Sequence, residues 1–145
     1  MSGFWRNWMT GWCLAAGMFG VVLAGGAFDA TSGPTRLLFG VLNGAADFDA
    51  GASMRSSLAV LGAVTIGWSL TLLAAIQAAN QLGEDGGPVW RMIAVSLLAW
   101  YAIDSGLSIA TGFGLNAVPN TIFLASFLLP IFRAGRLRTL EPKTS

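Results

Sequence analysis

Long apolar runs, separated by short polar stretches, dominate the pattern of the chain. Four of them cover approximately residues 8–28, 56–79, 90–112 and 117–133. Each is close to the ~20 apolar residues that a helix needs to cross the hydrocarbon core of a bilayer. Because no water within lipid can satisfy a backbone N–H or C=O group, each run is predicted to be a helix. The pattern therefore predicts an all-α fold, an integral membrane four-helix bundle that forms one domain over residues 1–145.

A shorter segment with a different pattern lies between the first two runs. In TSGPTRLLFGVLN, Pro34 suits a first helical turn, and one helical face carries Leu37, Leu38, Val41 and Leu42. This predicts a short extracytoplasmic amphipathic helix at about residues 33–43. Such a helix can lie on the outer membrane surface or dip in over the mouth of the bundle, and the pattern fits both positions.

The basic residues are distributed unequally between the two sides of the predicted bundle. With four spans both termini share one side, whereas the other side receives only Arg36 and Arg55. The positive-inside rule then predicts a multi-pass protein of the bacterial inner (cytoplasmic) membrane, with both termini in the cytoplasm. The basic residues on the predicted cytoplasmic side are Arg6, Arg91, Arg133, Arg136, Arg138 and Lys143.

Tryptophan supports the same orientation. Its ring combines an apolar body with a polar N–H group, which suits the boundary between lipid and water. Tryptophans collect at the predicted cytoplasmic boundary, where we expect them to act as interface anchors. The predicted anchors are Trp5, Trp8, Trp12 and Trp90.

Composition supports lipid as the solvent and removes several classes of chemistry. Hydrophobic residues make up 54% of the chain and charged residues only 10%, whereas soluble domains carry roughly 25% charged residues. The chain has no histidine and a single cysteine, Cys13, so it lacks the ligand sets of haem and zinc sites and any Ser-His-Asp arrangement. No cofactor is predicted. A net charge of +1 also gives no basic surface for nucleic acid.

One acid lies inside the third apolar run, in the stretch WYAIDSGLSIATGFGLNAVPN. A charge near the centre of a spanning helix costs ~2.5–3.5 kcal/mol, so Asp104 should face protein or water. Helical spacing places it on one stripe with Ser108 and Thr111, and a short turn brings the next helix alongside. The predicted polar seam within the membrane consists of Asp104, Ser105, Ser108, Thr111, Asn116 and Asn120.

Two roles for Asp104 are compatible with this seam. As a working group, it would load and release a proton or a cation. As a structural group, it would hold neighbouring helices together through hydrogen bonds. Arg55, at the outer start of the second span, is a possible counter-ion, and such a pair would favour the structural role. Thr65 and Ser69 in the second run are further possible members of the seam.

Small residues recur at every fourth position of the first run, at Ala16, Gly20 and Ala24. Small side chains let two membrane helices approach closely, so this stripe predicts a helix-packing face. A partner helix within the bundle is the preferred interpretation, and a dimer face between two chains is the alternative.

The two acids of the DFD sequence, Asp47 and Asp49, resemble a fragment of a divalent-cation loop. Calcium needs six or more oxygen ligands, and no third acid follows in register, so no metal site is predicted. A favourable interaction with the start of the second spanning helix is the preferred role of these acids.

A family resemblance is carried by two stretches, GAVTIGW and WYAIDSGLSIATGFGLNAVPNTIFL. Together they resemble a pattern of small four-helix inner-membrane proteins of bacteria that have no known activity. In that pattern an aromatic residue precedes an Asp-Ser pair, and two asparagines follow across a short turn that contains glycine. The resemblance implies a four-helix membrane protein in which Asp104, Ser105, Asn116 and Asn120 belong together, and it implies no reaction.

Small size, a small-residue packing face and the lack of catalytic residue types predict a non-catalytic protein rather than an enzyme. We expect an accessory or scaffold subunit of a larger membrane complex, of the respiratory or photosynthetic type, or a homo-oligomer. The expected partners are the lipid bilayer and other membrane subunits or copies of the chain itself. The alternative is a small oligomeric proton- or cation-coupled transporter that uses Asp104. A membrane enzyme, the third class, would need Asp104, Asp47 or Asp49 to act with a bound metal or a lipid substrate.

Overall fold

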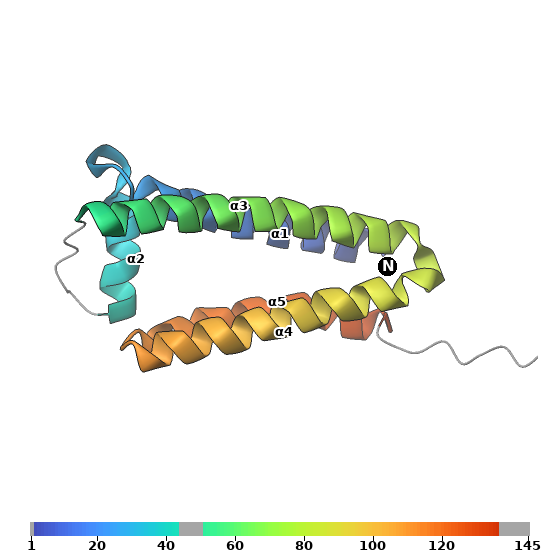
Figure 1. Ribbon diagram of the computed structural model, residues 1–145. Helices are drawn as coiled ribbons and strands as arrows, with labels where there is room; N and C mark the ends of the chain where they lie inside the picture. Colours follow the sequence, from blue (N-terminus) through green and yellow to red (C-terminus); the bar gives the residue numbers. More distant parts are fainter. Residues whose placement is uncertain (1, 44–50, 137–145) are drawn as a thin grey trace, which may run out of the picture.

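Five α-helices joined by short 3-10 turns make up the part of the chain that the computed structural model describes, residues 2–43 and 51–136 (Figure 1). The helices are α1 (Gly3–Gly25), α2 (Gly33–Asn43), α3 (Ala52–Gln81), α4 (Gly87–Ala110) and α5 (Ala117–Arg133). The turns are η1 (Asp29–Thr31), η2 (Gly83–Gly86) and η3 (Gly114–Asn116). The prediction of an all-α fold is confirmed for these residues.

Four stretches of this chain are long and apolar enough to cross a membrane. They are α1, α3, Gly83–Ala110 with α4, and Gly114–Arg133 with α5. α2 and α5 have the bounds predicted from the pattern, whereas α1, α3 and α4 begin earlier than predicted. In α1 the backbone hydrogen bonds continue through the polar flank, where the Arg6 amide donates to the Ser2 carbonyl at 3.1 Å. α1 therefore begins before the apolar run and ends at Gly25, three residues before the run does.

The position of α4 differs from its predicted span in a way that concerns Asp104. The helix begins at Gly87 with Pro88 in its first turn, and it ends at Ala110, before Gly112, whose φ of +86° is incompatible with a continued helix. Asp104 consequently lies about 9 Å from the last residue of α4, at a rise of 1.5 Å per residue. It is also about 8 Å from the middle of α4 at the same rise, so it lies about midway between the centre and the end of the helix rather than near the centre.

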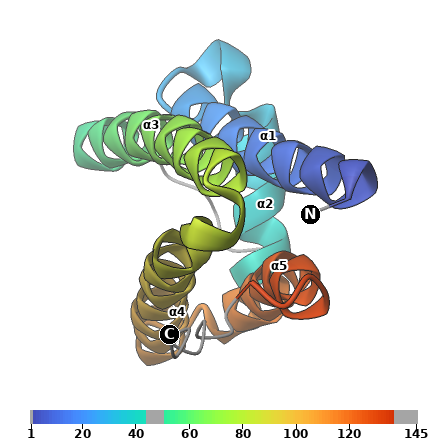
Figure 2. The same cartoon turned by 90° about the vertical axis from the view of Figure 1, so that its right-hand side faces the viewer.

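The long helices form two antiparallel pairs, α1 with α3 and α4 with α5 (Figure 1). The pairs lie close together at the end of the molecule that carries the α3–α4 turn, and they diverge toward the opposite end, where α2 lies. A view turned by 90° shows the same two layers (Figure 2). α2 contacts α1 and η3, so it spans the distance between the layers. The long helices thus form two pairs joined at one end rather than an evenly packed bundle.

The hydrophobic core lies at the joined end. α1 and α4 contribute residues from their first halves, and α3 and α5 contribute mainly from their second halves, so the core is on the side of the α3–α4 turn. At the same end, Arg136 Nη1 donates to the carbonyl of Gly83 at 2.7 Å and fastens the end of α5 to that turn. The buried core residues are Met9, Trp12, Cys13, Leu72, Ile76, Ala79, Trp90, Ile93, Leu97, Leu124, Phe127 and Ile131.

Two of the tryptophans predicted to anchor the interface belong to this core instead. Trp12 is 6% exposed and stacks on Phe123 with ring centroids 3.8 Å apart, and Trp90 is 0% exposed. Because α1 starts earlier than predicted, Trp12 lies about 14 Å into the helix, at a depth where its face meets α5. Trp5 and Trp8 remain at least partly exposed and pack edge to face. Trp12 and Trp90 are therefore core residues rather than interface anchors.

Two indole N–H groups of α1 donate to backbone carbonyls of α5. Trp8 Nε1 donates to the carbonyl of Ser126 at 3.0 Å, and Trp12 Nε1 donates to the carbonyl of Phe123 at 3.0 Å. The Ser126 carbonyl would normally accept from the backbone of residue 130, but Pro130 has no N–H group. Trp8 supplies the donor that the proline removes.

Small residues allow α1 and α3 to approach each other closely. Gly20 and Gly62 face each other: a Cβ atom added at Gly20 would lie 2.9 Å from the Gly62 carbonyl oxygen. A Cβ atom added at Gly62 would collide with the backbone of Gly20 and Ala24. Ala16, one turn before Gly20, is buried. The small-residue stripe of α1 is thus in contact with a helix of the same chain.

Candidate functional site

The predicted polar seam gathers around Asp104, where α4 turns through η3 into α5. Asn116 Nδ2 donates to Asp104 Oδ2 at 3.2 Å, and Asn120 Nδ2 donates to the same oxygen at 2.5 Å. Asn116 ends η3 and Asn120 lies about one helical turn later in α5, so both amides fall on one side of the hairpin. These three side chains join α4 to α5.

Two serine hydroxyls complete the group. Asn116 Nδ2 also donates to Ser108 Oγ at 3.0 Å, and Asn120 Nδ2 also donates to Ser105 Oγ at 3.2 Å. An asparagine amide carries two N–H donors, so each amide gives one to the carboxylate and one to a serine. We refer to the five residues as the Asp104 cluster: Asp104, Ser105, Ser108, Asn116 and Asn120.

The Asp104 cluster is only partly enclosed. Ser105 and Asn120 are buried, whereas Asp104, Ser108 and Asn116 are half-buried. Both amides donate to Oδ2 of the carboxylate. Within residues 2–43 and 51–136, Asp104 Oδ1 accepts no hydrogen bond and Asp104 forms no ion pair. One carboxylate oxygen is therefore uncommitted.

Three hydroxyl residues proposed for the seam lie outside the cluster. The Thr111 hydroxyl donates to the carbonyl of Leu107 at 2.8 Å, within its own helix. Thr65 and Ser69 likewise donate to backbone carbonyls of α3. Hydroxyl side chains in helices commonly bond the carbonyl three or four residues earlier, which competes with contacts to another helix. Helical spacing alone therefore included too many residues in the seam.

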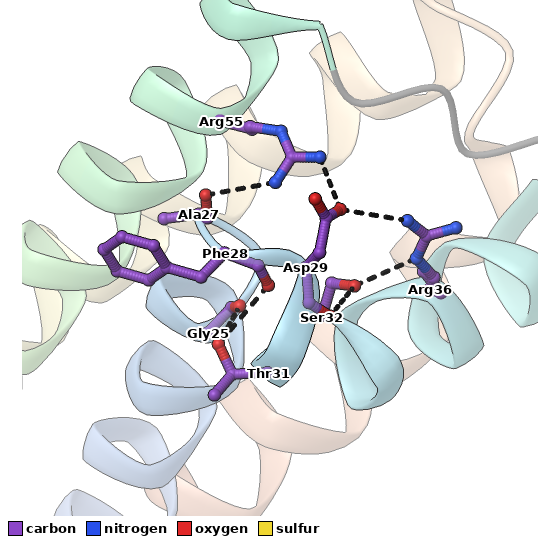
Figure 3. A network of polar contacts seen from close by, with 8 residues as sticks. All are labelled: Gly25, Ala27, Phe28, Asp29, Thr31, Ser32, Arg36 and Arg55. Carbon is purple, nitrogen blue, oxygen red and sulfur yellow. Dashed lines mark hydrogen bonds and ion pairs between the residues drawn. The ribbon is translucent and has the colours of Figure 1, made fainter.

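Arg55 pairs with Asp29 and not with Asp104 (Figure 3). Its Nη2 lies 2.5 Å from Asp29 Oδ1, and its Nη1 donates to the carbonyl of Ala27 at 3.4 Å. Because α3 begins beside the end of α1, the guanidinium meets the η1 turn, which carries an acid of its own. The predicted role of Arg55 as counter-ion to Asp104 is wrong.

Asp29 also links α2 to this network. Its Oδ1 lies 3.6 Å from Arg36 Nη2, and Arg36 Nε donates to Ser32 Oγ at 2.9 Å (Figure 3). The hydrogen bond from Arg55, together with the charge of Arg55, holds the pKa of Asp29 below its ordinary value of 3.8. Asp29 was not among the predicted site residues, although its position between the first apolar run and the basic residue Arg36 was a usable signal.

α2 is fixed at both layers of the molecule. Thr35 is fully buried and donates its hydroxyl to the carbonyl of Val22 in α1 at 2.6 Å. Phe39 packs edge to face on Phe113, just before η3, with ring centroids 5.9 Å apart. α2 therefore connects the end of α1 to the turn that carries Asn116.

The described residues contain no group of three or more His, Cys, Asp or Glu side chains that could hold a metal ion. Asp47, Asp49, Arg138 and Lys143 lie outside the described residues. Asp104 is instead surrounded by four neutral polar side chains. A single carboxylate in such a setting can join helices, take up a proton or bind a monovalent cation.

No family model matches the chain, and no curated protein or solved structure matches it. The resemblance to small four-helix inner-membrane proteins therefore stays a prediction. Function must be inferred from the Asp104 cluster and from the arrangement of the helices around it.

Proposed function

We propose that the chain is a non-catalytic, multi-pass protein of a bacterial inner membrane that works by association. It would assemble with copies of itself, or serve as an accessory or scaffold subunit of a larger complex of the respiratory or photosynthetic type. The four long apolar helices support membrane insertion. The distribution of basic residues supports cytoplasmic termini, with α2 on the outer side.

The observation that carries the association proposal is the uncovered polar surface of the α4–α5 pair. Away from the core the two helix pairs diverge, and there Asp104 is half-buried. Nearby, the hydroxyl of Tyr101, a half-buried residue that packs against the edge of the core, bonds to the hydroxyl of the exposed Thr121 at 2.9 Å. Hydrocarbon is a poor environment for such groups, which in membrane proteins face protein or water. A second protein surface over this half of the pair would cover them.

Native mass spectrometry of the protein extracted in several mild detergents tests the proposal. We expect a multiple of the 15.1 kDa chain mass, or a fixed ratio to a co-purifying subunit. Cross-linking in the intact membrane before extraction shows whether the assembly precedes detergent treatment. A species of single-chain mass without a partner, in every detergent and after cross-linking, would contradict association.

A matched pair of variants locates the contact surface. Thr121→Trp places a large side chain on the uncovered half of the α4–α5 pair and should reduce the assembled fraction. Met92→Trp makes a similar change at an exposed position of the joined end and should leave assembly intact. Equal effects of the two variants would argue against the uncovered half as the contact surface.

The uncommitted oxygen of Asp104 favours a second candidate function, a small oligomeric proton- or cation-coupled transporter. Its test is ion uptake by vesicles that contain the purified protein. Asp104→Asn should abolish uptake while the protein remains folded and inserted. Undiminished uptake by the variant would contradict this function, and so would loss of the fold in mild detergent, which would assign Asp104 a structural role.

A further inference from the structure

We propose that the Asp104 cluster is a binding site for a monovalent metal cation of the alkali series, with sodium as the probe ion. This inference deepens the second candidate function by naming the ion that Asp104 would bind, and ion binding without ion uptake would separate the two. It is independent of association, because a monomer can bind the ion and an oligomer can lack it. The ligand atoms would be oxygens of Asp104, Ser105, Ser108, Asn116 and Asn120.

The negative charge of Asp104 has no partner of opposite charge among the described residues. Asp104 lies in one of the four stretches apolar enough to cross a membrane, where an uncompensated carboxylate is strongly disfavoured. Its hydrogen-bonding partners Asn116 and Asn120 are neutral, and no arginine or lysine among the described residues pairs with it. Arg55, the counter-ion predicted from the sequence, is engaged with Asp29. One positive charge from an ion would make the site neutral.

The single carboxylate of Asp104 matches an ion with one positive charge. Calcium takes six to eight oxygen ligands, typically with several carboxylates among them. The described part of the chain brings no second acid to Asp104. One carboxylate with neutral oxygen ligands balances a monovalent cation and leaves a divalent cation with excess charge.

The side chains around Asp104 carry further oxygen atoms that can act as ligands. The amides of Asn116 and Asn120 now present Nδ2 to the carboxylate and to the serine hydroxyls. A half-turn about the last side-chain bond, which is a broad and nearly two-fold torsion, exchanges Nδ2 for Oδ1 at the same place. Each amide then offers an oxygen within hydrogen-bonding distance of Asp104. Hard cations prefer such carboxylate, carbonyl and hydroxyl oxygens.

The backbone beside the cluster forms a short turn between two helices. α4 ends and η3 intervenes before α5 begins, so helical hydrogen bonding is interrupted beside Asn116. The amides of Gly112, Phe113 and Asn116 donate to the carbonyls of Ile109, Ser108 and Phe113, so the turn holds Asn116 close to the end of α4. The geometry therefore combines a lone carboxylate, neutral side chains that carry oxygen atoms, and a short turn that holds them together.

A proton is the competing ligand of Asp104. A proton on Asp104 Oδ1 would create an O–H donor that needs an acceptor, and within the described residues this oxygen makes no hydrogen bond. At Oδ2, two N–H donors already occupy the oxygen. Once the amides turn their oxygens toward Oδ2, that oxygen can hold a proton or a cation, and the response of the carboxyl band to pH and to sodium distinguishes the two.

Thermal unfolding of the purified full chain in mild detergent tests the site. Sodium chloride replaces choline chloride at constant ionic strength, because choline is too large for a site of this kind. We expect the unfolding temperature to rise by a few degrees and to saturate with sodium concentration, since an ion that binds only the folded state stabilises it. The rise should be absent in Asp104→Asn and present in Asp85→Asn, which removes an exposed carboxylate of η2.

Two further measurements keep the test decisive if Asp104→Asn does not fold. Ser108→Ala keeps the carboxylate and removes one oxygen, so the sodium concentration for half-maximal stabilisation should rise several-fold. In the unaltered protein, exchange of choline for sodium should shift the carboxylate band in an infrared difference spectrum.

The proposal is overturned by any of three results. The first is an unfolding temperature of the unaltered protein that does not change with sodium, lithium or potassium. The second is an equal sodium effect in the unaltered protein and in Asp104→Asn. The third is a carboxyl band that responds to pH and not to sodium, which would identify the proton as the ligand. The mass of the same samples reports on association separately.

Discussion

Trp8 of α1 donates its indole N–H to the carbonyl oxygen of Ser126 in α5, 3.0 Å away. That carbonyl is the one left without a helical donor by Pro130. In a membrane no water is available to replace the lost hydrogen bond, so neighbouring helices must supply one. A contact between the first and last long helices thus compensates a local defect, and it holds α1 against α5.

Replacement of Trp8 by phenylalanine removes the donor and keeps most of the ring. Hydrogen bonds between membrane helices contribute about 0.6–1.7 kcal/mol, and we expect Trp8→Phe to lower the free energy of unfolding by about 1 kcal/mol. The loss should be smaller in a Pro130→Ala background, where residue 130 regains its N–H. Reversible unfolding in mixed detergent measures the unaltered protein, the two single variants and the double variant of this double-mutant cycle. Equal losses in both backgrounds would disprove the link between Trp8 and Pro130, and Trp5→Phe serves as the control.

The contact between Gly20 and Gly62 predicts opposite effects of one substitution at two positions of α3. Gly62→Ala forces a methyl group into the backbone of α1, and such overpacking costs roughly 1–3 kcal/mol. Gly67→Ala meets no atom within 4 Å, and it should be neutral or stabilising by up to about 1 kcal/mol because alanine favours the helix. Thermal unfolding in one detergent compares the two variants. Similar behaviour of both would show that α1 and α3 are not in close contact at Gly62.

The ion pair between Arg55 and Asp29 predicts a dependence of stability on acid pH. The pKa of Asp29 is lowered in the folded protein from 3.8, chiefly by the hydrogen bond and charge of Arg55. The stabilisation is therefore fully present above pH 3.8 and disappears as the pH falls through the lower folded value. Unfolding temperatures of the unaltered protein and of Asp29→Asn should differ near neutral pH and converge in acid. A difference independent of pH would contradict this, and Asp85→Asn controls for general charge effects.

The proposed orientation predicts which loops a membrane-impermeant maleimide can reach. In a Cys13→Ala background, Val41→Cys reports on exposed α2, and Glu84→Cys reports on the exposed η2 turn. We expect Val41→Cys to be labelled in intact spheroplasts and Glu84→Cys only after permeabilisation. The reverse pattern would place the termini outside, and labelling of both in intact spheroplasts would contradict a spanning arrangement.

Local features were predictable from the sequence, because they depend on spacing along one or two adjacent elements. Apolar length indicated four long helices, and the amphipathic pattern indicated α2 with its observed bounds. The short turn after α4 was enough to bring Asn116 and Asn120 together with Asp104. These residues are close in sequence as well as in space.

Features that depend on how distant helices meet were not predictable in this way. Asp104 was the only partner considered for Arg55, and it is the packing of α3 beside the end of α1 that brings Arg55 to Asp29. Trp12 has the composition of an interface residue, yet its depth in α1 and its contact with Phe123 make it a core residue. The divergence of the two pairs also follows from where bulky core residues meet, which no single run of residues records.

Because the core is confined to one end of the molecule, a small rotation of the helices there produces a large movement at the opposite end. The outer part of α4 extends about 20 Å beyond Leu97, the last core residue of that helix, at a rise of 1.5 Å per residue. A rotation of about 5° at the core would move that end by about 2 Å, at this rise and length. Thr35 and Phe39 hold α2 to both layers at the far side. The distance between the two helix pairs at the end away from the core therefore depends on α2, a helix of eleven residues, and not on the core.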